Sequence, residues 1–284
     1  MQERKRVHYH HADGVALGGT IEHPFQDTIP VHASLSLPPM GGHITTHVGR
    51  FEYRDIVSYS SASVHVAGKG LHSDGPWTTQ VTTTVEDLNL LEVVKAKRVV
   101  ARISTEHPAE GYHPNVSFIG TEFEGLRIGG CDVSVDLDVN FCKTGKDGRH
   151  PERSCTDDDA FLERVNQQRK VFIDEKKRLE KARNKVSDFV TRHASDYSDG
   201  KHRKSGHLLC SLVRKITVDE SQKQFAGKGL GHILHVPDFG RVYLAELIVS
   251  HGHFQLIMLR FELGCPVVGT TGVVVARVNG STDP

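Results

Sequence analysis

The stretch Val133-Ser-Val-Asp-Leu-Asp-Val-Asn-Phe141 decides the fold class. Its apolar side chains alternate with Ser, Asp and Asn, which is the period of a strand with one buried and one solvated face. A second alternating run, from Trp77 to Val85, follows the turn residues Ser73-Asp-Gly-Pro76. Two such runs in one half of the chain indicate an antiparallel sheet that packs one face on a core.

Further strand candidates extend outward from these runs. In the first half they lie at residues 31–37, 50–57, 63–66, 99–103 and 116–119, and in the second half at 208–218 and 273–278. The apolar runs 241–250 and 254–263 are separated by His251-Gly-His253, which predicts an antiparallel hairpin. We therefore predict a mainly β protein, built as an antiparallel β-sandwich or flattened barrel.

A basic segment interrupts this pattern. Residues 143–205 carry 17 basic and 12 acidic side chains, which leaves 18 and 23 in the rest of the chain. The part from 154 to 198 contains no Gly or Pro, and it predicts one amphipathic helix of about 30 residues, roughly 45 Å long, capped by Thr156 or an aspartate. We expect residues 1–142 and 206–284 to form a single β domain, and residues 143–205 to be a basic helical insertion.

The insertion also predicts an interaction. Val165, Phe172, Leu179 and Val186 recur every seven residues, which is the spacing of a seam between two helices. This seam predicts a homo-oligomer that associates through the helix. The alternative is a helix packed on its own sheet. The basic residues of the helix are interleaved with acidic ones, so a solvated face is favoured over a nucleic-acid surface.

Composition excludes several protein classes. Thirty-five Lys and Arg balance thirty-five Asp and Glu, so there is no overall field that would attract a polyanion or an anionic membrane. The five cysteines have irregular spacing, which argues against a disulfide scaffold and a zinc ribbon. No apolar run is long enough to span a membrane, and no apolar segment of a signal peptide follows the basic start. We expect a soluble, cytoplasmic protein with reduced thiols.

Histidines supply the candidate metal ligands. The chain has 19 of them, and the pairs His8 with His10 and His43 with His47 have the even spacing that places side chains on one face of a strand. Such pairs could bind Zn, Ni or Fe, but no third ligand is recognisable by spacing. We therefore expect no cofactor and only adventitious metal binding, with Zn or another divalent transition metal as the alternative.

The common catalytic motifs are missing from the sequence. The sequence contains no phosphate-binding loop, no GxSxG or SxxK motif, and no glycine fingerprint of nucleotide folds. The favoured function is a non-catalytic binding or self-assembly protein built on the sandwich. The alternative is a small-molecule enzyme whose pocket lies in the mouth of the β body. A variant of this alternative is an enzyme that depends on a metal bound by histidines.

Part of the chain is similar to a known family. The stretches 85–91, 99–103, 118–130 and 236–246 resemble strand and turn patterns of choice-of-anchor surface proteins, a bacterial β-rich family. The resemblance covers about half of the chain and leaves out the helix. It implies an all-β body interrupted by an insertion, and it implies no catalytic residues. Members of that family are generally exported and anchored, whereas this sequence lacks a recognisable signal or sorting tail.

Overall fold

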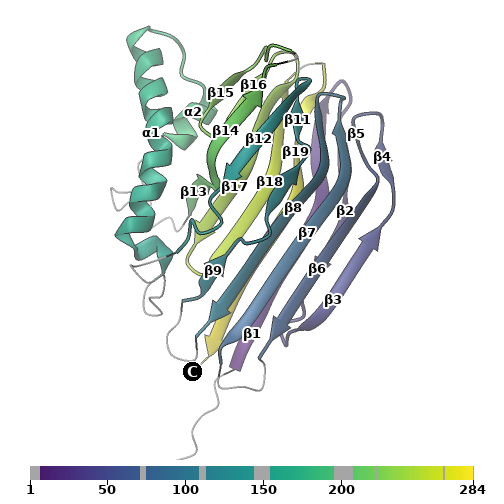
Figure 1. Ribbon diagram of the computed structural model, residues 1–284, viewed down its shortest axis with the longest axis vertical. Coiled ribbons are helices and arrows are strands. Elements are labelled where there is room, and N and C mark those ends of the chain that lie inside the picture. The colour runs from purple at the N-terminus through teal and green to yellow at the C-terminus, as the bar shows by residue number, and fades with distance from the viewer. Residues whose placement is uncertain are drawn as a thin grey trace, which may run out of the picture.

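The computed structural model describes residues 7–70, 75–108, 113–143, 154–194, 207–221, 223–264 and 266–283. They form two antiparallel sheets, A and B, that face each other as an open sandwich, with helices along one side (Figure 1). The predicted β-sandwich is therefore confirmed, and the sheets do not close into a barrel.

Sheet A has eight strands. In spatial order they are β15 (Lys228–Leu230), β16 (Ile233–Val236), β17 (Gly240–Ser250), β18 (His253–Gly264), β19 (Val268–Asp283), β1 (Val7–His23) and β2 (Asp27–Ser36), and β13 (Leu208–Ser211) also pairs with β17. The β17–β18 pair is the hairpin that the sequence predicts.

Sheet B has eleven strands. Its main path is β14 (Val213–Asp219), β12 (Cys131–Leu137), β11 (Arg127–Ile128), β8 (Val94–His107), β7 (Trp77–Leu90), β5 (Val57–Tyr59) and β4 (Phe51–Tyr53). The strands β9 (Asn115–Ser117) and β10 (Glu122–Glu124) pair with β8, while β6 (Ser61–Lys69) pairs with β7 and β3 (Gly42–Val48) with β6.

Segments from before and after the insertion share both sheets. In sheet A, β1 pairs with β19, and in sheet B, β12 pairs with β14. The sheets also touch directly, because the Thr83 hydroxyl donates a hydrogen bond of 2.9 Å to the Val275 carbonyl. A Cβ atom at Gly14 would lie 2.5 Å from Thr83 Oγ1, so this close approach requires glycine. The core between the sheets therefore depends on both parts of the chain.

A line of five residues, at which the inward and outward faces of the strands change places, crosses sheet A. It consists of Ala33, Ala16, Val274, Met258 and Ala245, one from each of five neighbouring strands, and it falls where the residue pairing is interrupted without a change of register. Ala33, Val274 and Ala245 have φ angles of 48°, 57° and 46°. At this pleat-reversal row two consecutive residues of a strand face the core, as Leu244 and Ala245 do, so the alternation of faces changes phase.

Two predicted strands end differently from the sequence pattern. The run 133–141 forms β12 only as far as Leu137, because the chain then turns and the Phe141 amide donates to the Asp138 carbonyl. The run 208–218 is split into β13 and β14, which belong to different sheets. At the crossing point, Leu212 donates its amide hydrogen to the Ala245 carbonyl. Period-two patterns therefore located these strands but not their ends.

The insertion contains the 3₁₀ turn η1 (Cys155–Asp157), the helix α1 (Asp159–Lys181) and the short helix α2 (Asp188–His193). Asp158 caps α1 by accepting from the Phe161 amide at 2.7 Å. The predicted length of about 30 residues was wrong, because α1 has 23 and ends where Arg183 adopts a left-handed φ of 54°. No helix in the described ranges is both long and apolar enough to cross a membrane.

Candidate functional site

The insertion packs on the outer face of sheet A. Figure 1 shows α1 beside the edge of the sandwich near β13, β15 and β16, with α2 between α1 and the sheet. Phe172 of α1 is buried against Ile233 and Tyr243, which lie on the sheet. These three side chains form a second hydrophobic cluster, separate from the core between the sheets. A charged network is enclosed next to this cluster.

Glu246 and Arg260 form the centre of the network. Arg260 donates to both carboxylate oxygens of Glu246, including a 2.9 Å bond from its terminal nitrogen to Oε1. The guanidinium also lies over the Tyr243 ring, 3.5 Å from its centroid. In an uninterrupted strand, Tyr243 and Glu246 would point to opposite faces, being three residues apart. The reversal at Ala245 places both on the outer face.

Two histidines face the same carboxylate. His193 ends α2, and His232 lies in the turn between β15 and β16. The Nε2 atom of His193 is 3.5 Å from Glu246 Oε1, and that of His232 is 3.7 Å from it. The side chains of His193 and Glu246 are each 3% exposed and that of His232 is 7% exposed. Neither Nε2 atom has a hydrogen-bond partner.

The surroundings fix the ionisation of these groups. Burial would raise the pKa of Glu246, but the hydrogen bonds from Arg260 lead the opposing effects, and that pKa is held well below its usual value. Burial lowers the pKa of His232, although Glu246 opposes this effect. Glu246 is therefore an anion at neutral pH, and burial disfavours the protonated form of His232.

A second carboxylate continues the network toward solvent. Glu262 accepts hydrogen bonds from the Tyr243 hydroxyl at 2.6 Å and from Arg260 at 2.6 Å. Arg241 and Arg192 also contact it, at 3.0 Å and 3.2 Å. Burial acts to raise the pKa of Glu262, but these donors lower it to about 2. Glu262 is therefore ionised throughout the ordinary pH range.

Two adjoining cavities open beside this network, and we call them together the insertion cleft. One has a volume of about 640 Å³ and is lined by Lys185, Arg192 and Glu262, among others. The other, of about 380 Å³, is lined by Arg178, Lys228, Leu230 and Ile233, among others. Phe189 and Arg241 line both cavities, and the guanidinium of Arg241 lies 4.2 Å from the Phe189 ring centroid. Five cationic and three acidic side chains line the cleft, so it carries a net positive charge around an apolar centre.

The sequence-predicted histidine pairs lie elsewhere. His8 and His10 do point to one face of β1, and they are buried together with His107 of β8, which the sequence pattern did not identify. The Nδ1 atom of His10 is 2.7 Å from the Thr79 hydroxyl, and the His8 ring stacks on Trp77. Within the described residues, only His193, His232 and Glu246 bring three ligand atoms within 4.8 Å of one another.

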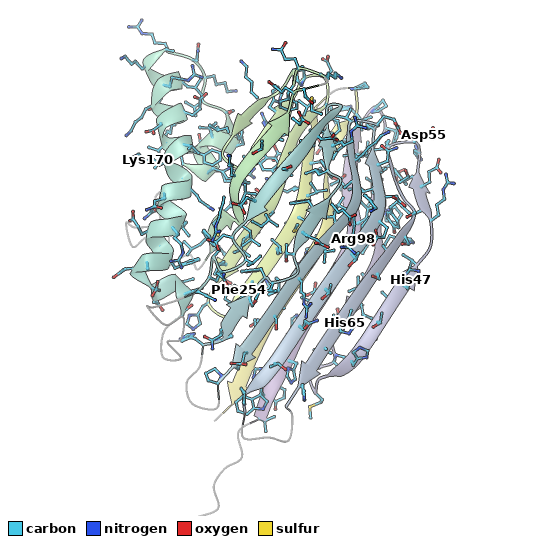
Figure 2. The ribbon with its side chains drawn as sticks, viewed as in Figure 1. His47, Asp55, His65, Arg98, Lys170 and Phe254 are labelled. Carbon is cyan, nitrogen blue, oxygen red and sulfur yellow. The ribbon has the colours of Figure 1, made fainter. Side chains whose placement is uncertain are left out.

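His43 and His47 share the outer face of β3, where both are exposed. The ring of His43 contacts that of His65 on the neighbouring strand, with centroids 4.5 Å apart. Figure 2 shows His47 and His65 on these adjacent strands of sheet B, far from α1. The structure therefore does not bring the two predicted pairs into one site.

The predicted seam residues divide into two groups. Val165 and Phe172 are buried within the chain's own fold, against the sandwich core and the second cluster respectively. Leu179 lies near the end of α1 and Val186 lies beyond it, and both are half-buried. Packing on its own sheet therefore accounts for the first half of the seven-residue pattern.

The buried histidines at the start of β1 predict a pH dependence of stability. Burial, aided by His107 and His10, lowers the pKa of His8 to about 3, and burial lowers the pKa of His107 to about 4. In the unfolded chain both titrate near 6.5. Between pH 6.5 and 4 the unfolded state therefore binds more protons, and stability should fall by up to about 1.4 kcal/mol per pH unit for each histidine.

Urea unfolding at pH 7.5, 6.0 and 5.0 measures this effect. The free energy of unfolding should decrease at each step, and His107→Gln should reduce the slope, because one of the buried histidines that titrate is removed. Glu262, with its pKa of about 2, contributes only at lower pH. Equal stability at the three pH values would show that these histidines are protonated as readily in the folded chain as in the unfolded one.

The cysteines within the described residues form no disulfide. Cys131, Cys142, Cys155 and Cys210 are buried free thiols, and Cys265 lies outside the described residues. Burial raises the pKa of the Cys142 thiol, with a further contribution from Cys155, and burial likewise raises that of Cys210. Cys142 and Cys210 are therefore held in the neutral, unreactive form.

Comparison with known proteins gives one match. No curated protein and no solved structure matches the chain. Residues 8–250 match the model of a family described as Domain of unknown function (DUF8256). The matched region includes the insertion, His193, His232 and Glu246, and it ends before β18. Since the match covers most of the sequence, the chain belongs to the DUF8256 family of domains of unknown function.

Proposed function

We propose that this protein is a non-catalytic binding protein, and that its ligand is a small organic anion held in the insertion cleft. The observation that carries the proposal is the composition of the cleft. Five cationic side chains, Lys185, Arg192, Arg241, Arg178 and Lys228, surround the apolar groups of Phe189, Leu230 and Ile233. A pocket that combines apolar contacts with a few charged groups is typical of small-molecule binding sites.

Two of the cations are available to a ligand. Arg178 pairs with Glu175, and Arg192 and Arg241 pair with Glu262. Lys185 and Lys228 form no ion pair with any residue in the described ranges, although the charge of Lys228 contributes to the lowered pKa of Glu175. An anionic group beside either lysine would gain charge-assisted hydrogen bonds without displacing a carboxylate from an ion pair with that lysine. Phe189 would contact the apolar part of the ligand.

The carboxylates of the cleft favour binding over acid–base catalysis. Hydrogen bonds from Arg178 hold the pKa of Glu175 below its usual value, and Glu262 has its pKa lowered to about 2. A general acid or base works best with a pKa near the working pH, which neither group has. An enzyme with its pocket in the mouth of the β body is less well supported, because both cavities of the cleft lie along the insertion.

The proposal predicts saturable binding of the fluorescent probe anilinonaphthalene sulfonate, which joins a sulfonate to aromatic rings. Lys185→Ala/Lys228→Ala should raise the Kd of the protein for this probe by about fivefold to tenfold, since two charge-assisted contacts are lost. The measurement is a fluorescence titration of the folded protein, checked by its thermal transition. Lys170→Ala is the matched control, because Lys170 is exposed on α1 (Figure 2) and lines neither cavity. Non-saturable binding, or the same Kd in all three proteins, would contradict the proposal.

A further inference from the structure

The network around Glu246 has a feature that the organic-anion site does not require. His193, His232 and Glu246 come from α2, the β15–β16 turn and β17, and they meet with little access to water. Their ligand atoms lie within 4.8 Å of one another. The contacts to Glu246 Oε1, 3.5 Å and 3.7 Å, are close to the separation of about 3.4 Å between ligand atoms around a tetrahedral zinc with bonds of 2.0–2.1 Å.

The hydrogen bonding of His193 orients it as a ligand. Its Nδ1 atom is 2.8 Å from the Phe189 carbonyl oxygen, which can only accept, so Nδ1 carries the hydrogen. In the neutral ring the lone pair is then on Nε2, which faces Glu246. Metal-ligating histidines commonly donate their second ring nitrogen to a carbonyl in this way.

A cation between the two rings and the carboxylate would complete this arrangement. A lone pair on His193 Nε2 directed at an anionic oxygen 3.5 Å away is repulsive. Arg260 supplies charge to Glu246, but it leaves the Nε2 atoms of both histidines without hydrogen-bond partners. A single divalent ion satisfies all three ligand atoms.

We propose that His193, His232 and Glu246 bind a transition-metal ion, for which Zn²⁺ is the best match. Two imidazoles and one carboxylate are a common zinc donor set, and hard ions such as Mg²⁺ and Ca²⁺ prefer oxygen ligands. His232 also lines a cavity of about 190 Å³. Arg260 holds the carboxylate in position from the other side. Because the ligands come from the insertion and from sheet A, the metal fastens one to the other.

The experiment uses the untagged full chain, so that no purification tag contributes histidines. After equilibration with Zn²⁺ and removal of the excess, elemental analysis should give about one zinc per chain. The ligand variants His193→Gln and His232→Gln should weaken zinc binding at least about hundredfold. The matched control is His43→Gln/His47→Gln, which removes two exposed histidines of the same type and should leave the stoichiometry unchanged.

Measurements on the wild-type protein alone also test the zinc-binding proposal, so the test does not depend on whether the variants fold. Zn²⁺ should raise its Tm, and Co²⁺ should give the intense visible bands of a tetrahedral site that Zn²⁺ then abolishes. The proposal is overturned if the folded wild type takes up no zinc, if Co²⁺ shows only the weak spectrum of the hydrated ion, or if the control variant loses the metal. None of these outcomes depends on ligand binding in the cleft.

Discussion

Replacing Glu246 by leucine is expected to lower the free energy of unfolding by about 3–5 kcal/mol. The substitution keeps a side chain of similar size but removes the anion that accepts two hydrogen bonds from Arg260. The Arg260 side chain is only 16% exposed, so its charge would remain in a poorly solvated position. Glu262 still contacts Arg260 but shares its charge with Arg192 and Arg241. Urea unfolding followed by circular dichroism measures the loss.

Two further variants separate the cost of an unpaired buried charge from the worth of the pair. Glu246→Leu/Arg260→Met should recover most of the lost stability, because neither charge is left alone. Glu52→Gln, in the exposed pair of Glu52 with Arg50, should cost under about 1 kcal/mol. If Glu246→Leu proves as harmless as Glu52→Gln, the network is solvated and the burial argument is wrong.

Phe172→Ala should also cost about 3–5 kcal/mol, because it opens a cavity in the second hydrophobic cluster. The Phe172 ring stacks on His193 with centroids 4.8 Å apart and lies against Ile233 and Tyr243. A Cβ added to Gly231 would be 3.0 Å from the same ring, so the surrounding chain already packs tightly on it. The measurement is again the free energy of unfolding, together with limited proteolysis of the insertion.

Leu179 provides the comparison, since it belongs to the same seven-residue pattern but is only half-buried. Leu179→Glu should keep the thermal transition. Light scattering of this variant then tests the predicted self-association: a wild-type oligomer that becomes a folded monomer supports the seam. If Phe172→Ala retains full stability, the second cluster does not hold the insertion against sheet A.

Strands with regular alternation or a clear turn were predictable from the sequence. The hairpin of β17 and β18 follows from two apolar runs around Gly252, and β7 follows from its alternation after a turn. The long strand β1 was missed because His8, His10 and Gly14 occupy inward positions where the pattern expects large apolar residues. The end of α1 was missed because Arg183, rather than glycine, adopts the left-handed conformation.

The network around Glu246 could not be predicted from the spacing of residues, because its members are far apart in the sequence. His193 precedes His232 by 39 residues and Glu246 by 53, and no motif links such distances. A weaker signal existed: Glu246 and Arg260 are opposite charges inside two apolar runs that form a hairpin. Isolated charges in buried strands are usually paired, so the ion pair could have been inferred. The histidines depend on how the insertion folds back, which the sequence pattern does not specify.

The pleat-reversal row couples the evolution of five strands. Ala33, Ala16, Val274, Met258 and Ala245 occupy one line across sheet A, and each strand switches its inward-facing residues at that line. Deleting one residue from a single strand would move its switch point out of line with its neighbours and turn half of its side chains to the wrong face. Insertions and deletions in these strands are therefore tolerated only at their ends. The same constraint keeps Tyr243 and Glu246 on one side of β17, so the geometry of the network depends on the register of the whole sheet.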